Sequence, residues 1–314
     1  MEYQLILPII FRAMNKARIA LVAGIVSISI FPILVKLGLT SGLISAFYRM
    51  AIAFVLLLPV VFLTKQWQKP TLRIALLSAL CGVLFGADVA VWNIAIQESS
   101  ATQATLLTNL SPIWVGVGAF FVLADKPKLN FWIGTLVALL GMVTIVGFQF
   151  FVEMKFDRAF LFGILSGIFY SWYFLTSKGV LDKTNVPTFM LINLFASSVF
   201  LGILNWVAGE AFYGFSNTAW LVLFVQALVC QLFAWFALNF AISKMRATRV
   251  SLSLLGQALL TAILAWYFLS EPVTLQMLIG GLILLTGIGF TFISTPIPQL
   301  LKFKKKKRKL VAEF

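Results

Sequence analysis

Apolar and polar positions form long blocks along this chain, in which ten apolar stretches of about twenty residues are separated by short polar gaps. A helix needs ~20 mostly apolar residues to cross the ~30 Å hydrocarbon core of a membrane. The pattern therefore predicts an all-α integral membrane protein with ten transmembrane helices. The expected spans cover residues 18–37, 43–63, 73–96, 102–123, 130–149, 160–180, 187–208, 219–242, 248–269 and 273–294.

The basic residues lie mainly in every second gap between these spans. With the N-terminus in the cytoplasm, 20 of the 24 Lys and Arg residues fall in or beside cytoplasmic segments, and the others are Lys36, Arg49, Lys155 and Arg158. Cytoplasmic loops of membrane proteins carry such an excess of Lys and Arg. We therefore expect a multi-pass protein of the plasma membrane (the inner membrane of a bacterium) with both termini cytoplasmic.

Composition excludes several other classes of protein. The chain is 61% apolar and only 11% charged, whereas soluble domains carry about 25% charged residues. The net charge of +14 could suggest nucleic acid, but the basic residues flank the spans, so anionic membrane lipid is the expected partner. The chain has no histidine, and Cys81 and Cys230 fall inside spans, so we expect no metal site, no cofactor and no disulfide framework.

The chain also repeats itself. Residues 93–141 align without a gap on residues 239–287, and 14 of these 49 positions are identical. The matches include one asparagine pair and two glycine pairs: Asn93 with Asn239, Gly134 with Gly280 and Gly141 with Gly287. Spans three to five thus correspond to spans eight to ten, and because five is odd the two halves have opposite orientations. Inverted repeats around a central site are the architecture of many secondary transporters.

This repeat divides the chain into expected segments. They are a cytoplasmic N-terminal segment (1–17), a first five-helix repeat (18–149), an external linker (150–159), a second repeat (160–294) and a basic cytoplasmic tail (295–314). Pro32 and Pro112 lie within spans one and four, where proline removes a backbone donor and bends the helix. Both are candidate hinges, and a purely structural bend is the alternative. Ala258 lies opposite Pro112, so the sequence does not predict a matching kink.

Three charged residues inside spans are candidates for coupling or for an ion pair: Lys36, Arg49 and Asp88. Charged groups inside a membrane usually face the protein interior and mark substrate or ion pathways. Asp88 could bind a substrate ammonium group or a coupling proton, or it could be a structural partner of Arg49. Arg49 could instead contact a substrate carboxylate, whereas Lys36 could simply anchor its span at the membrane interface.

Polar and aromatic residues recur at helical spacing in four other spans. Each could serve helix packing, but together they suggest the lining of a central cavity. The stripes are Thr105, Thr108, Asn109 and Pro112; Ser166, Tyr170, Tyr173 and Ser177; Gln231, Trp235 and Asn239; and Ser253, Gln257 and Thr261. The substrate-binding candidates are Asp88, Trp92, Thr105, Asn109, Tyr170, Tyr173, Gln231, Trp235 and Gln257.

Several short motifs carry a resemblance to a known family. They are PILVKLGL (32–39), FYRMAIA (47–53), WNIAI (92–96), ATQATLLTNLSP (101–112) and LADKP (123–127). With ten spans and a duplication, the chain resembles the drug/metabolite transporter superfamily in its EamA branch. The resemblance implies a ten-helix basket around a cavity lined by helices one, three, four, six, eight and nine, with helices five and ten at the periphery or at an oligomer contact.

The expected function is therefore secondary active transport. The resemblance implies transport of small metabolites, often amino acids. The inverted repeat, Asp88 and the polar stripes favour alternating-access export or exchange of a small metabolite such as an amino acid or amine, with protons as a candidate coupling ion and a monomer or homodimer as the assembly. A transporter-like receptor or channel is the alternative. An intramembrane enzyme is disfavoured, because the chain has no histidine and no paired intramembrane carboxylates stand out.

Overall fold

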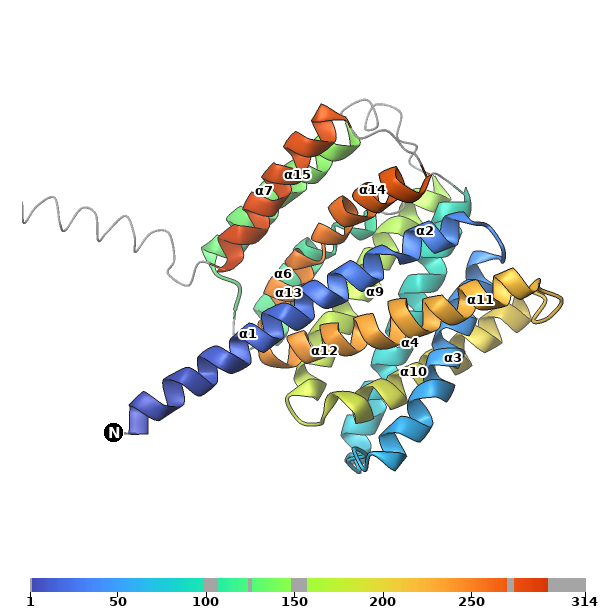
Figure 1. Cartoon of the computed structure of the whole chain (residues 1–314), viewed down its shortest axis with the longest axis horizontal. Helices are drawn as coiled ribbons and strands as arrows, with labels where there is room; N and C mark the ends of the chain where they lie inside the picture. Colours follow the sequence, from blue (N-terminus) through green and yellow to red (C-terminus); the bar gives the residue numbers. More distant parts are fainter. Residues whose placement is uncertain (1, 99–106, 124–125, 148–156, 270–273, 293–314) are drawn as a thin grey trace, which may run out of the picture.

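The computed structural model describes residues 2–98, 107–123, 126–147, 157–269 and 274–292. Within these residues every regular element is a helix, as the apolar pattern predicts (Figure 1). Eight helical segments are long and apolar enough to cross a membrane, and two shorter apolar helices cover Ser111–Val122 and Leu129–Ile145. The predicted all-α membrane fold with about ten helices is therefore confirmed.

The first repeat contains α1 (Glu2–Ser29), α2 (Phe31–Lys36), α3 (Gly42–Leu63), α4 (Leu72–Glu98), α6 (Ser111–Val122) and α7 (Leu129–Val146). α1 and α2 together form the first span. α1 begins well before the expected start at residue 18, because the apolar run at residues 5–11 lets the helix start earlier. Residues 102–106, at the expected start of the fourth span, lie outside the described residues.

The second repeat contains α9 (Arg158–Leu181), α10 (Val186–Val207), α11 (Asn217–Val225), η1 (Gln226–Phe233), α12 (Ala234–Lys244), α13 (Ala247–Ser253), α14 (Gly256–Leu269) and α15 (Leu275–Phe292). η1 is a π-helical stretch between α11 and α12, and these three elements form the eighth span. α13 and α14 form the ninth span.

Local sequence explains where many helices begin. A polar side chain just before the first turn accepts a hydrogen bond from the backbone N–H three residues later, which satisfies one of the donors that a helix leaves open at its start. The capping residues are Ser41 for α3, Asp157 for α9, Asn185 for α10 and Ser216 for α11.

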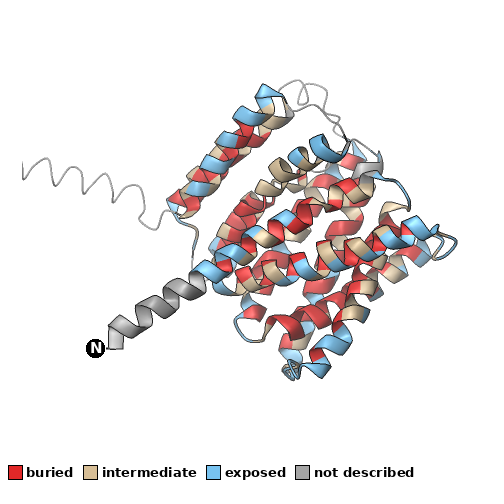
Figure 2. Ribbon diagram, viewed as in Figure 1, coloured by how far each residue is buried: buried red, intermediate tan, exposed pale blue. Residues whose placement is uncertain are grey.

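The surface and part of the interior differ from those of a soluble protein. Large apolar side chains such as Leu63, Phe121 and Trp206 are 76–81% exposed, while the charged side chains of Arg49 and Asp88 are buried. Figure 2 shows that the buried positions are concentrated where the helices of the main bundle face one another. This distribution fits an exterior in contact with lipid tails and a mainly apolar interior that also holds charged groups.

α7 and α15 lie side by side as a pair that stands apart from the main bundle (Figure 1). Their contact is made by the glycines that the repeat predicts to be equivalent. A Cβ on Gly134 would lie 2.6 Å from the Gly287 carbonyl oxygen, and one on Gly141 would lie 2.7 Å from that of Gly280. The earlier glycine of α7 contacts the later glycine of α15, and the later contacts the earlier, so the two helices are antiparallel, as inverted repeats require. Helices five and ten therefore occupy the periphery, as the family resemblance implies.

The first and fourth spans are interrupted where prolines predict a bend. α1 ends at Ser29, and Pro32 lies in the first turn of α2. The Ser29 carbonyl accepts a hydrogen bond of 3.0 Å from the Thr261 hydroxyl of α14, which replaces its bond within the helix. Membrane helices tolerate such breaks where a neighbour satisfies the backbone.

The break in the fourth span has a counterpart that the sequence does not predict. A turn at residues 109–110 precedes Pro112 and α6, and a turn at residues 254–255 separates α13 from α14. The two turns occupy nearly equivalent positions in the repeats, although Ala258 replaces Pro112. The second break therefore needs no proline.

Candidate functional site

Asp88 joins the two repeats in the middle of the bundle. It lies on α4, it is 6% exposed, and its Oδ1 accepts a hydrogen bond of 2.5 Å from the Ser166 hydroxyl on α9. The Ser166 oxygen in turn lies 2.9 Å from the Thr108 hydroxyl. This chain of oxygen atoms links α4, α9 and the segment before α6, so within the described residues the buried carboxylate is hydrogen-bonded by the Ser166 hydroxyl, which in turn contacts Thr108.

Arg49 forms a second buried polar group in the same interior. It lies on α3, and its Nε donates a hydrogen bond of 2.8 Å to the Gln231 side-chain oxygen. The guanidinium also lies over two aromatic rings, 4.2 Å from the ring centre of Phe31 and 5.8 Å from that of Phe85. Such cation–π contacts stabilise a desolvated cation.

Arg49 and Asp88, both among the described residues, do not form the direct ion pair that the sequence left open as one alternative. Within the part of the chain that the structure describes, the two residues have the separate hydrogen-bond partners given above, although their charges are close enough to interact electrostatically. Rotation of α3 and α4 about their axes decides which neighbour each side chain reaches, and sequence spacing does not fix that rotation. The interior therefore holds a cation and an anion that remain separate.

The π-helical stretch η1 presents two glutamines to α3. Gln231 accepts from Arg49, and Gln226 accepts a hydrogen bond of 2.8 Å from the Ser45 hydroxyl. In an α-helix, residues five positions apart point roughly 140° apart, because each residue turns by about 100°. The wider π turn closes between residues five apart and so brings them closer to alignment. Gln226 is not among the residues that the sequence predicts for the site, because an α-helical period places it off the Gln231 face.

An aromatic cluster, formed by Phe85, Tyr170, Tyr173 and Trp235, lies between α4, α9 and α12. The ring centre of Trp235 lies 4.5 Å from that of Phe85, 5.4 Å from that of Tyr173 and 6.2 Å from that of Tyr170. The Tyr173 hydroxyl donates a hydrogen bond of 3.0 Å to Asn239 of α12. The buried Trp235 Nε1 has no hydrogen-bond partner within the described residues.

The structure brings some of the predicted site residues together and leaves others aside. Trp92 is half-buried and packs against Phe31, 6.1 Å between ring centres. Asn109 and Gln257 are half-buried and, among the described residues, neither side chain hydrogen-bonds another candidate. Thr105 lies outside the described residues, as does the side chain of Lys36, which ends α2.

The arrangement suits recognition of a charged or zwitterionic molecule. The interior holds a carboxylate, a guanidinium and aromatic rings, which are the kinds of group that pair with an ammonium group, a carboxyl group and an apolar substituent respectively. No group of three or more His, Cys, Asp or Glu side chains that could hold a metal ion occurs in the residues that the structure describes.

Comparison with known proteins places the chain in a family. The model of the EamA-like transporter family matches it twice, at residues 15–147 and 157–293. "Uncharacterized transporter YdfC" of Bacillus subtilis (strain 168) is 26% identical over 79% of this chain and 81% of its own length. The "S-adenosylmethionine uptake transporter" of Rickettsia felis is 24% identical over 79% of this chain and 82% of its own.

A solved crystal structure shares the fold, with a TM-score of 0.75 and 13% identity over 89% of this chain and 98% of the solved one. The family and the named relatives indicate a multi-pass membrane transporter for a small molecule. The family model matches the chain twice, and the EamA-type resemblance in the sequence is thereby confirmed. This chain belongs to the EamA-like transporter family.

Proposed function

We propose that this protein is a secondary active transporter that moves an amino acid or a related amine by alternating access across the plasma membrane, as an exporter or an exchanger. The observation that carries the proposal is the separation of the two buried charges. Asp88 and Arg49 each keep a neutral hydrogen-bond partner, Ser166 and Gln231 respectively. A zwitterion carries one group of each sign and can pair with both.

The position of these groups between the repeats supports an alternating-access mechanism. Asp88 and Arg49 belong to the first repeat, whereas Ser166 and Gln231 belong to the second. A relative rocking of the repeats would therefore change both hydrogen bonds. Two inverted halves of similar structure can form two conformations of similar energy, one open to each side.

The aromatic cluster supports an amine-bearing substrate. Phe85 precedes Asp88 by three residues on α4, and Trp235 packs against both Phe85 and Tyr170. Aromatic ring faces attract cations. One relative is named for uptake of S-adenosylmethionine, which contains an amino-acid group. The positive-inside distribution of Lys and Arg supports cytoplasmic termini.

Flux measurements on the purified full chain in proteoliposomes test the proposal. Liposomes preloaded with an unlabelled amino-acid mixture are expected to take up labelled amino acids by exchange, and Arg49→Gln is expected to reduce this exchange about tenfold or more. Asp88→Asn is expected to reduce exchange, gradient-driven uptake or both. Asp182→Asn, which alters an exposed acid paired with Lys178, is the matched control and should retain both. Absence of saturable flux for every amino acid and amine would overturn the proposed substrate class.

The same assay separates two roles for Asp88. If the carboxylate binds the substrate ammonium, Asp88→Asn abolishes both exchange and uptake driven by a proton gradient. If it carries the coupling proton, Asp88→Asn abolishes gradient-driven uptake but retains exchange. A variant that keeps wild-type rates in both assays would exclude Asp88 from the mechanism.

A further inference from the structure

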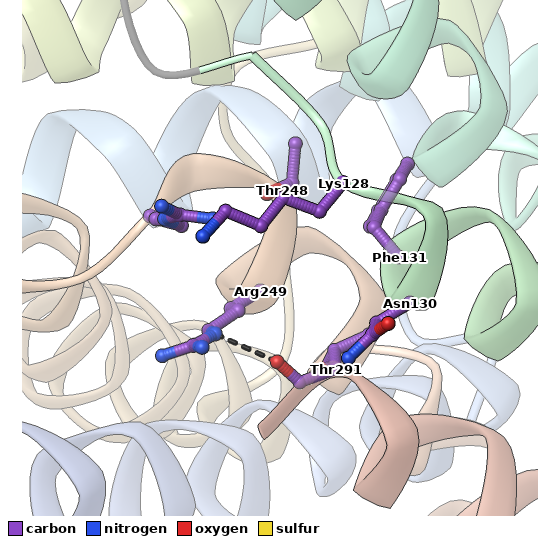
Figure 3. A pocket seen from close by; sticks show the side chains of 7 residues that line it. Lys128, Asn130, Phe131, Thr248, Arg249 and Thr291 are labelled. Atoms are coloured by element: carbon purple, nitrogen blue, oxygen red, sulfur yellow. Dashed lines mark hydrogen bonds between the residues drawn. The ribbon is translucent and has the colours of Figure 1, made fainter. Parts of the chain in front are cut away.

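A second polar site lies away from Asp88, at the ends of the helices. A pocket of about 250 Å³ opens where α7 and α13 begin and α15 ends (Figure 3). Its walls come from both repeats, and one of them belongs to the peripheral α7–α15 pair. The lining residues are Lys128, Asn130, Phe131, Arg246, Thr248, Arg249 and Thr291.

The lining combines positive charge with buried polar groups. Three of its residues, Lys128, Arg246 and Arg249, are cations, and the lining that the structure describes includes no acid. Asn130 and Thr248 are 4% and 5% exposed, so their polar side chains are held inside the protein rather than in open solvent. A pocket of this kind favours an anion with several oxygen acceptors.

Local backbone structure adds to the positive field. Lys128 precedes α7 and provides no side-chain cap, so the positive end of an 18-residue helix dipole borders the pocket. Arg249 is held in position, because its Nε donates a hydrogen bond of 2.8 Å to the Thr291 carbonyl at the end of α15. Figure 3 shows this bond beside the pocket, with the Lys128 side chain nearby. Arg18 of α1 lies 5.8 Å from the ring of Phe292, as does Arg249.

We propose that this pocket binds a phosphate group, carried by an anionic phospholipid headgroup or by a soluble phosphate ester. A phosphate offers oxygen acceptors to cations on several elements at once, and the location at helix ends beside exposed apolar surface suits a lipid headgroup. A bound phosphate would bridge Lys128 of α7 and Arg246 before α13. It would therefore tie the peripheral α7–α15 pair to the main bundle and stabilise the assembly. The site is independent of the transport site around Asp88.

The test uses the delipidated full chain in detergent. In one arm, phosphatidylglycerol or phosphatidylcholine is added and the bound lipid is counted by native mass spectrometry. In the other, thermal stability is measured in sodium phosphate and in sodium chloride at equal ionic strength. We expect the protein to retain phosphatidylglycerol in preference to phosphatidylcholine. In the double variant Lys128→Gln with Arg246→Gln, the affinity for phosphatidylglycerol should fall about fivefold for each cation removed.

The matched control carries Lys69→Gln with Arg73→Gln, which removes the same charge from two exposed cations outside the pocket. If the double variant does not fold, the single variant Lys128→Gln is measured instead, because Lys128 is exposed and its replacement should not affect folding. Selective retention of the anionic lipid supports a headgroup site, and stabilisation by phosphate alone supports a soluble ester. Equal losses in pocket and control variants, or no response in either arm, would overturn the proposal.

Discussion

The hydroxyl of Ser166 donates a hydrogen bond of 2.5 Å to the carboxylate of Asp88, and this bond joins α9 of the second repeat to α4 of the first. Burying a carboxylate in a membrane interior is unfavourable unless hydrogen bonds or opposite charges compensate it. The bond therefore has two roles: it stabilises the acid, and it makes the packing of the repeats depend on the state of that acid.

Ser166→Ala should destabilise the protein by about 1–3 kcal/mol, because it leaves the Asp88 carboxylate without this donor. Thermal unfolding of the purified protein in detergent measures the loss. The control is Ser171→Ala on the same helix, since the buried Ser171 hydroxyl donates, among the described residues, to the backbone carbonyl of Ile168 and to no charged group. Equal shifts in the two variants would show that the bond to Asp88 contributes nothing specific.

A double-mutant cycle should detect the partner of Arg49. We expect Arg49→Leu and Gln231→Leu to show a coupling of about 1.5–3 kcal/mol, the usual contribution of a hydrogen bond to a charged group. The comparison cycle pairs Arg49→Leu with Asp88→Leu and should give a smaller value, because the two side chains make no direct contact in the part of the chain that the structure describes. Reduced unfolding free energies measured by denaturant titration provide both values. A larger coupling to Asp88 would favour a direct ion pair instead.

Gly141→Ala should separate α7 from α15. A Cβ at this position would lie 2.3 Å from the backbone nitrogen of Leu284, and backbone cannot move aside as a flexible side chain can. We expect a loss of about 1–3 kcal/mol, as for other overpacked positions. Gly289→Ala on α15 is the control, since a Cβ there meets no atom within 4 Å. The measurement is thermal unfolding, and an unchanged melting temperature in Gly141→Ala would contradict the close approach.

Thr261→Val should weaken the junction between α1 and α2. The change preserves shape but removes the hydroxyl that donates to the Ser29 carbonyl, and such bonds in membranes contribute about 0.6 kcal/mol on average. Thr286→Val is the matched control, because that exposed hydroxyl donates within its own helix, to Leu282. Hydrogen exchange at residues 28–34 should rise only in Thr261→Val. Equal exchange in both variants would show that the hydroxyl does not hold the break.

The sequence predicted those parts of the structure that depend on periodicity. The sequence itself contains the apolar spans, the internal repeat and Pro32, which predicts the break between α1 and α2. The structure confirms the all-α fold. The glycine pairs were visible in the repeat, and their contact follows from the inverted orientation of the two halves. Ser166 was visible as part of a polar stripe.

The hydrogen-bond partners of the buried side chains could not be predicted from periodicity. Whether Arg49 reaches Asp88 or Gln231 depends on the rotation of each helix about its axis and on its depth in the bundle. The spacing of residues along the sequence determines neither of these. The turn at residues 254–255 is not accompanied by a proline from which it could be predicted. The π geometry of η1 likewise has no distinct composition, so Gln226 was overlooked.

This π-helical stretch gives the eighth span spare length. A π turn contains more residues than an α turn. If one residue of η1 were deleted, the stretch could become α-helical, and the side chains of α12 would keep their orientation about the helix axis. Elsewhere in the span, the same deletion would swing every later side chain by about 100° and carry Trp235 and Asn239 away from α9. The irregular turn is therefore the place where this span tolerates a change in length.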